Sequence, residues 1–312
     1  MLYVTGVKLE GIHHITAITA DAQKNVDFYV GVLGLRLVKK TVNQDNPTVY
    51  HLFFADEKGS AGSDLTFFEF PGVPAGRAGA GDVHRVVWRV GSVEALDFWA
   101  ERLGAHGIES ERAGVGLRFS DPEGLDHELA VVEVDDEPLS AEHPEVPAEL
   151  ALQGFHAVCA YSAAPEASSQ LLETLQFESV QEGWEARGEK RGGLYLYDDP
   201  PEESSKQGAG SVHHVAWASK VEDYEAWRDR AIAGGAQPTP FIDRFYFRSI
   251  YFREPSGVLF EIATLGPGFT VDEPLEHLGE KLSLPPDYEH LRDEVESNLR
   301  PVVNPRVAKT GG

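Results

Sequence analysis

The segment Gly11-Ile-His-His-Ile-Thr-Ala-Ile decides the fold, because the chain repeats its pattern three more times. Each copy has a glycine, a histidine two or three residues later, and an apolar run typical of a buried strand. The later copies are Gly81-Asp-Val-His-Arg-Val-Val-Trp, Gly154-Phe-His-Ala-Val-Cys-Ala-Tyr and Gly210-Ser-Val-His-His-Val-Ala-Trp. Four such strands predict four related structural units.

A helical pattern follows each of these strands, with aromatic and aliphatic residues at three- and four-residue spacing. The predicted helices cover residues 22–33, 92–105, 164–175 and 221–234. Strand-like segments then close each unit, at residues 49–54 and 65–70, 116–119 and 125–132, 193–197, and 247–252 with 258–263. This order predicts four βαβββ modules, at about residues 8–72, 80–135, 152–200 and 208–265.

The predicted fold class is therefore α+β, with four βαβββ modules that form two pseudo-symmetric half-barrel domains. Residues 1–135 would hold the N-terminal pair of modules and residues 152–265 the C-terminal pair. The stretch between them is rich in Glu and Pro and is a predicted linker. Residues 266–312 form a Pro-rich arm with one amphipathic helix near residues 287–299.

The charge balance limits the partners. The chain has 312 residues, with 27 basic and 51 acidic side chains and a formal net charge of −24. Nucleic acids and anionic membranes would be repelled, and no segment approaches the roughly 18 uninterrupted apolar residues of a membrane helix. The acidic surface is either an ordinary solvated shell or an adaptation to a salty cytoplasm. The chain start lacks signal-peptide features, and Cys159 has no second cysteine to pair with, so we expect a cytoplasmic location.

The four equivalent strands can be compared position by position to identify a metal site. The residue after the shared histidine is His14, Arg85, Ala157 and His214 in the four units. A plain core strand has no reason to place imidazole there in the first and fourth units only, so these two histidines are predicted ligands. The third candidate is Glu261, a carboxylate inside an apolar closing strand that is costly to bury unless it is paired or metal-bound.

Two histidines and one carboxylate are the facial triad of non-haem Fe(II) oxygenases. Mn(II) fits the same ligands, and zinc is compatible with an oxygen ligand. The matching residue in the second unit is Glu128, which lacks a partner histidine because Arg85 takes its place. The second unit is therefore predicted to be a structural copy.

The last hairpin adds a candidate beside the metal. Pro255-Ser256-Gly257 suits a three-residue loop with glycine in the left-handed position. That register places Tyr251 opposite Glu261, and opposite residues share a face of the ladder. The equivalent pair in the second unit is Arg118 and Glu128, a predicted salt bridge.

Several longer motifs resemble one known family. They are residues 9–16, with His-His-Ile-Thr, residues 27–41, residues 50–56 (Tyr-His-Leu-Phe-Phe-Ala-Asp), Gly154-Phe-His, Val212-His-His, residues 244–261 and Gly268-Phe-Thr-Val-Asp-Glu-Pro. From about residue 8 to 300, the chain resembles ring-cleaving dioxygenases of the vicinal oxygen chelate (glyoxalase/extradiol dioxygenase) superfamily. The resemblance is to the hydroquinone-cleaving branch typified by 2,6-dichlorohydroquinone dioxygenase.

This resemblance implies a site walled by the first and fourth modules. It implies Fe(II), or Mn(II), held by His14, His214 and Glu261, with a small dihydroxylated aromatic and O₂ as substrates. The residues around the ligands would be His13, Thr16, His213, Arg244 and Tyr251. Regular strand alternation, however, sends His13 and His14 to opposite faces, and likewise His213 and His214, so that only a bend or bulge would bring both into one cavity.

Two other functions stay open on this fold. One is a glyoxalase-like lyase or isomerase, in which the metal only polarises a carbonyl. The other is a non-catalytic protein that binds an aromatic compound or a quinone. The sequence also leaves open a homo-oligomer, the ring substituents, and the choice between a hydroquinone and a catechol.

Overall fold

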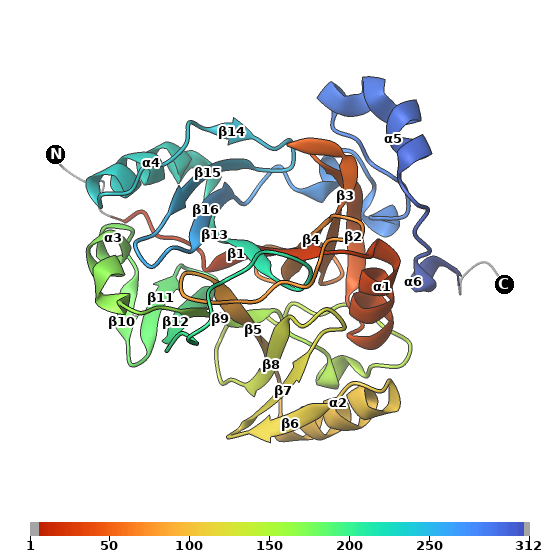
Figure 1. Cartoon of the computed structure of the whole chain (residues 1–312), viewed down its shortest axis with the longest axis horizontal. Helices are drawn as coiled ribbons and strands as arrows, with labels where there is room; N and C mark the ends of the chain where they lie inside the picture. Colours follow the sequence, from red (N-terminus) through yellow and green to blue (C-terminus); the bar gives the residue numbers. More distant parts are fainter. Residues whose placement is uncertain (1–5, 309–312) are drawn as a thin grey trace.

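The computed structural model describes residues 6–308, and its strands form two eight-stranded sheets (Figure 1). The first sheet has the order β14-β15-β16-β13-β1-β4-β3-β2. Its strands are β1 (Ile12–Thr19), β2 (Arg36–Asn43), β3 (Asn46–Ala55), β4 (Asp64–Glu69), β13 (Val212–Ser219), β14 (Ile242–Asp243), β15 (Arg248–Arg253) and β16 (Leu259–Thr264). The first and fourth modules thus share one curved sheet.

The second sheet repeats this arrangement with the second and third modules, in the order β10-β11-β12-β9-β5-β8-β7-β6. Its strands are β5 (Val83–Val90), β6 (Ser110–Ala113), β7 (Gly116–Ser120), β8 (Asp126–Val131), β9 (Phe155–Tyr161), β10 (Glu178–Val180), β11 (Gly183–Arg187) and β12 (Gly192–Asp198). The predicted α+β class with βαβββ modules and two half-barrels is confirmed. Each sheet takes strands from both sides of the predicted linker, and the division into residues 1–135 and 152–265 stays a prediction about the chain.

The predicted helices are present but shorter than the apolar patterns suggest. The long ones are α2 (Val93–Ala105) and α4 (Tyr224–Ala233), whereas α1 (Ala22–Val26) continues as a π-helical turn over Asp27–Val32. A 3₁₀ turn leads into α3 (Ser169–Thr174), and another leads into α5 (Arg292–Asn298) in the C-terminal arm, which ends with α6 (Pro305–Ala308). Within residues 6–308 no helix has the length and apolar composition that a bilayer crossing requires.

The four repeat glycines have a shared structural reason. Gly11, Gly81, Gly154 and Gly210 all have φ between 79° and 89°, the left-handed region that favours glycine. Each one also lies against the backbone of another module. The closest approach is at Gly210, where an added Cβ would lie 2.2 Å from the carbonyl oxygen of Glu123 in the hairpin of the second module. The four repeat glycines therefore lie where modules that are distant in the chain pack against one another.

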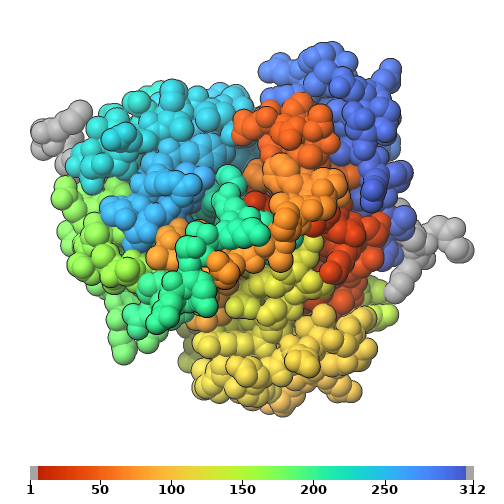
Figure 2. Space-filling view, in the orientation of Figure 1, coloured from red at the N-terminus to blue at the C-terminus, as the bar shows by residue number. Residues whose placement is uncertain are grey.

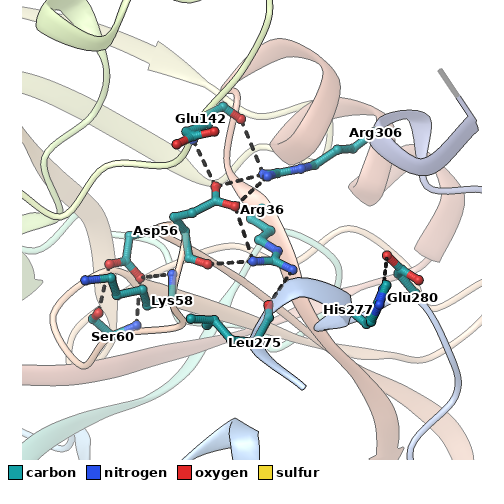
Figure 3. A network of polar contacts seen from close by, with 10 residues as sticks. Arg36, Asp56, Lys58, Ser60, Glu142, Leu275, His277, Glu280 and Arg306 are labelled. Carbon is teal, nitrogen blue, oxygen red and sulfur yellow. Dashed lines mark hydrogen bonds and ion pairs between the residues drawn. The ribbon is translucent and has the colours of Figure 1, made fainter. Parts of the chain in front are cut away.

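The C-terminal arm lies along the outside of the β2–β3 hairpin (Figure 2). Figure 3 shows one of its attachments, in which Arg306 reaches a carboxylate of the first module. That carboxylate belongs to Glu57, which accepts from Arg306 Nη1 at 3.0 Å and from Arg36 Nη1 at 3.2 Å. Glu142 of the linker donates its backbone N–H to the same carboxylate at 3.1 Å. The arm, the linker and the first module thus meet at one partly buried ion cluster.

A second attachment buries a lysine. Lys39 of β2 is fully buried, and its ammonium forms ion pairs with Asp272, at 2.7 Å, and with Glu273, both in the arm. Asp272 also accepts a 2.9 Å hydrogen bond from the hydroxyl of Tyr246. A buried lysine is tolerated only when it is paired, so Lys39 fixes the arm to the sheet and to the segment before β15.

We expect Gly210→Ala to destabilise the fold, because the new methyl group would meet backbone atoms in a left-handed conformation. The expected loss in free energy of unfolding is about 2–4 kcal/mol, measured as a lower melting temperature by circular dichroism. Gly104→Ala is the matched control, since Gly104 lies in α2 with ordinary φ and an added Cβ there meets no atom within 4 Å. Equal melting temperatures for the two variants would contradict the docking role.

Candidate metal centre

The two predicted histidine ligands come together where the first and fourth modules join. His14 lies on β1 and His214 on β13, which pair antiparallel at the middle of the sheet. Glu261 lies on β16, beside Ala216 of β13. The Nε2 atoms of the two histidines are 3.3 Å apart, and Oε2 of Glu261 lies 3.2 Å from His14 Nε2 and 2.9 Å from His214 Nε2. His14, which is 200 residues before His214 in the chain, thus meets the two ligands of the fourth module at one point.

This triangle fits a divalent metal ion. Two ligand atoms each about 2.1 Å from a metal and at right angles would be about 3.0 Å apart, close to all three separations. Glu261 is completely buried, and its Oε2 has no hydrogen-bond partner among the described residues. A buried carboxylate oxygen without a partner is costly, which a cation at this point would relieve. Within residues 6–308, these three side chains form the one His/Cys/Asp/Glu group that could hold a metal ion.

The other oxygen of Glu261 is held by the protein. The buried hydroxyl of Ser249 on β15 donates a short hydrogen bond to Oε1. Burial raises the pKa of Glu261, but the adjacent His14 and His214 outweigh it and hold the pKa well below its usual value. The carboxylate is therefore ionised and oriented, with Oε2 directed at the histidines. Sequence analysis missed Ser249, whose hydroxyl gives no pattern that distinguishes it from other strand serines.

His13 and His14 do not point to opposite faces, because β1 carries a bulge of the kind that the sequence analysis required for them to share one side. Ile12 pairs with Trp217 and His14 with Ala216, so His13 is an extra residue on β1. A second bulge makes His213 the extra residue on β13, between the pairs of Thr16 with His214 and Ala17 with Val212. A bulge places two successive side chains against one partner residue, and each adjacent histidine pair now lies on one side of the sheet.

The first bulge determines which ring nitrogen of His14 carries the proton. Nε2 of His13 lies 3.1 Å from the carbonyl oxygen of Thr264, which can only accept, so this nitrogen carries a proton. Burial, with His14 next in effect, lowers the pKa of His13 to about 3, and its Nδ1 is therefore an acceptor. That Nδ1 is 2.9 Å from His14 Nδ1, which must donate. His14 Nε2 is left unprotonated and faces Glu261, as a metal ligand requires.

The second bulge repeats half of this arrangement. His213 Nδ1 lies 2.8 Å from His214 Nδ1, and His213 lines the cavity in front of the three ligands. Burial lowers the pKa of His213 to about 4 and also lowers the pKa of His214. Both rings are thus neutral near pH 7, so they can accept or donate a hydrogen bond without carrying charge.

The predicted hairpin register is confirmed, since Tyr251 pairs with Glu261 and Glu254 with Val258 around Pro255-Ser256-Gly257. The Tyr251 ring lies 5.8 Å from the His214 ring, edge to face. Arg244 Nε donates to the Tyr251 hydroxyl at 3.2 Å. Burial raises the pKa of Tyr251, so the phenol keeps its proton and can donate it to an oxygen in the cavity.

A cavity of about 320 Å³ opens in front of the three ligands. Its walls are largely aromatic, with Phe53, Phe68, Tyr246, Phe247 and Tyr251 among them. Its polar lining residues include Asn43, Asp45, His51, His213, Thr239 and Arg244. Flat aromatic walls with a few directed polar groups are typical of a site for a small aromatic molecule.

Two predicted site residues, His13 and Thr16, do not line this cavity. His13 lies behind His14, and Thr16 lies beside Thr66. The Thr16 hydroxyl lies 2.8 Å from the hydroxyl of Thr66, which in turn lies 2.9 Å from His51 Nε2. The structure therefore places Thr16 behind the wall, connected to the cavity through His51. Sequence analysis missed His51 and Asp45. The only available signal for His51 was its place in the Tyr50-His-Leu-Phe-Phe motif.

The second sheet shows what the same positions do without the histidine pair. The bulges recur at His84 and His156. Arg85 stands where His214 would be, and Ala157 where His14 would be. Arg85 forms an ion pair with Glu128 at 3.2 Å, while Arg118 donates to the same carboxylate at 2.8 Å. The predicted salt bridge between Arg118 and Glu128 is confirmed. A guanidinium thus lies against this carboxylate, where the first sheet has an imidazole.

Comparison with known proteins agrees with this geometry. The model of the glyoxalase/bleomycin resistance protein/dioxygenase superfamily matches residues 11–129 and 166–262. MhqA of Bacillus subtilis, provisionally named a ring-cleaving dioxygenase, is 40% identical over 95% of this chain and 100% of its own length. A chlorohydroquinone/hydroquinone 1,2-dioxygenase of Sphingobium indicum is 34% identical over 92% of this chain and 95% of its own length.

Solved structures show the same fold. The crystal structure of a dioxygenase from Bacillus subtilis, also named provisionally, superposes with a TM-score of 0.88 at 38% identity, covering 96% of this chain and 99% of that one. Glyoxalase I from Zea mays has a TM-score of 0.55 at 14% identity, covering 81% of this chain and 92% of that one, which shows a shared fold only. The chain therefore belongs to the glyoxalase/bleomycin resistance protein/dioxygenase superfamily.

Proposed function

We propose that this protein is a ring-cleaving dioxygenase that uses Fe(II) and O₂ to open a hydroquinone-type aromatic ring. The observation that carries the proposal is the buried centre of His14, His214 and Glu261 at the end of an aromatic-walled cavity. Three protein ligands on one face leave coordination positions open for a substrate oxygen and O₂. The names of the relatives support ring cleavage, and one of them names hydroquinone.

His14, His214 and Glu261 would hold the metal. When bound there, Fe(II) would supply open positions for the substrate and O₂ and the redox chemistry that joins them. Mn(II) suits the same ligand set. A structural zinc site fits less well, because it closes its tetrahedron with four protein ligands.

The side chains around the centre have separable tasks. The aromatic walls would stack on the ring and exclude water, and Tyr251 would donate its proton to an oxygen of the substrate. Arg244 would polarise that phenol through the hydrogen bond to its oxygen. His213, adjacent to a ligand and lining the cavity, would accept or deliver a proton. His13 and Thr16 would act through their neighbours, by orienting His14 and His51.

The deciding experiment is oxygen uptake by anaerobically purified, iron-loaded protein with a panel of hydroquinones and catechols. Uptake coupled to loss of the aromatic absorbance supports the proposal. A glyoxalase-like lyase or isomerase would turn over without consuming O₂. A binding protein would retain its aromatic ligand unchanged. Metal analysis of the same preparation shows which ion the three ligands hold.

We expect His14→Ala, His214→Ala and Glu261→Ala each to lower metal content sharply, because each removes one of only three protein ligands. Metal per chain is measured by elemental analysis after dialysis against a weak chelator, and circular dichroism checks the fold. Full occupancy in all three variants would refute the assignment. Glu128→Gln is the matched control from the second sheet, where Arg85 replaces the ligand, and it should retain the metal.

His13 tests the orientation of a ligand. His13→Phe keeps a ring but removes the acceptor for His14 Nδ1, so metal affinity should fall about 10- to 100-fold. His156→Phe changes the equivalent bulge residue in the second sheet and should leave metal affinity unchanged. Affinity is measured by competition with a chromogenic chelator. Equal affinities in the two variants would show that the His13 hydrogen bond does not orient the ligand.

Tyr251→Phe should lower turnover more than metal binding, because Tyr251 is not a ligand. Losing one hydrogen bond to a charged oxygen costs roughly 1.5–3 kcal/mol, or about 10- to 150-fold in rate when the bond forms mainly in the transition state. The measurement is kcat with a hydroquinone alongside metal content. Wild-type turnover in this variant would remove Tyr251 from the mechanism.

A further inference from the structure

Arg244 is the only lysine or arginine among the described residues that line the cavity. Its two terminal nitrogens are already occupied, since Nη1 donates to Asp45 Oδ1 at 3.1 Å and Nη2 donates to Asp45 Oδ2 at 3.0 Å. Its third nitrogen, Nε, donates to Tyr251. Each of the three nitrogens of the one cation in the cavity lining therefore already donates a hydrogen bond to the protein.

Asp45 is exposed, but the turn that carries it is held from several sides. Its own backbone N–H donates to Asn43 Oδ1 at 2.9 Å. The side chain of Gln44 donates to the carbonyl oxygen of Arg244 at 2.8 Å, and the hydroxyl of Tyr288 in the C-terminal arm donates to the carbonyl oxygen of Gln44 at 2.8 Å. These bonds keep the β2–β3 turn, and with it Asp45, against Arg244 at the edge of the cavity.

We propose that Asp45 determines which ring substituents the site accepts, and that it selects against rings with an anionic substituent. The inference rests on the proposed dioxygenase function and narrows its substrate class to dihydroxylated rings with uncharged substituents, such as hydrogen, alkyl or halogen. Asp45 contributes in two ways. It neutralises the one guanidinium that could pair with a substrate anion, and it adds a like charge at the edge of the cavity.

Anionic and uncharged substituents differ in the free energy that they lose when they leave water for the cavity. An anionic substituent that enters an aromatic-walled cavity loses water and needs a cation or several donors in exchange. A bidentate guanidinium would suit a planar or tetrahedral anion well, but here its fork is occupied by a carboxylate of the protein. An uncharged substituent makes no such demand and packs against the aromatic walls.

The test compares two ligands of matched size, hydroquinone sulfonate and its uncharged sulfonamide. A sulfonate is a weak ligand for divalent metals, so that chelation does not mask the effect of charge. Dissociation constants are measured by calorimetry with metal-loaded protein and O₂ excluded, and kcat/KM is measured with O₂ present. Wild-type protein should bind the sulfonamide at least about 10-fold more tightly than the sulfonate.

Asp45→Asn should raise the sulfonate-to-sulfonamide affinity ratio at least about 10-fold, because it frees Arg244 and removes the like charge. Asp287→Asn is the matched control. Asp287 is an exposed carboxylate next to Tyr288 in the arm, outside the cavity lining, and this variant removes one charge from the same side of the molecule. Adding Arg244→Gln to Asp45→Asn should cancel the gain.

Equal sulfonate and sulfonamide affinities in wild-type protein would overturn the proposal. So would equal shifts in Asp45→Asn and Asp287→Asn, which would indicate a general effect of surface charge. The binding ratio does not depend on turnover. If no ring consumed O₂, the dioxygenase function would fail while the role of Asp45 would still be decided by binding.

Discussion

The antiparallel pairing of β1 with β13, with one bulge on each strand, is the constraint on which the site depends. Without the bulges, His13 and His213 would face the opposite side of the sheet from the ligands. With them, each ligand histidine has a second histidine beside it, within hydrogen-bond distance of its Nδ1. The strand that supplies a ligand thus also supplies the group that sets its proton position, one residue earlier in the chain.

The same bulges occur in the second sheet, which lacks the histidine ligands. They are therefore a feature of the repeated modules and do not depend on a metal site. His84 and His156 occupy them, yet the centre of that sheet is an ion cluster of Arg85, Glu128 and Arg118. Both sheets must therefore satisfy a carboxylate at the same place, fully buried in the first sheet and partly buried in the second. The second sheet uses two guanidinium groups, and the first uses two imidazoles, which leave one carboxylate oxygen without a hydrogen-bond partner. Substitutions at two positions separate the two outcomes, since Arg85 replaces His214 and Ala157 replaces His14.

Much of this site was predictable because the four repeated strands can be compared with one another at equivalent positions. The four aligned strands identified His14 and His214, and the loop length at Pro255 set the register that places Tyr251 across from Glu261. The apolar pattern alone did not predict the bulges, since one extra residue in a strand leaves no mark in it. Only the placement of both histidines of a pair at one site required a bend or bulge. Ser249, His51 and Asp45 were missed for a related reason. Their partners are Glu261, Thr66 and Arg244, which lie 12, 15 and 199 residues away along the chain and are brought close only by the folded sheet.

The C-terminal arm lies outside the repeats and supplies no lining residue, yet it holds parts of the cavity wall in place. The three ligands and both bulges come from strands of the first and fourth modules, so the repeats alone suffice to build the centre. The cavity in front of it depends on Tyr246, whose hydroxyl is held by Asp272, and on the Gln44 turn, which is held by Tyr288. Asp272 is fixed in turn by the buried ammonium of Lys39. The repeat therefore positions the chemistry, whereas the arm shapes the space in which a substrate would lie, and changes in the arm can alter which substrates fit without changing a ligand.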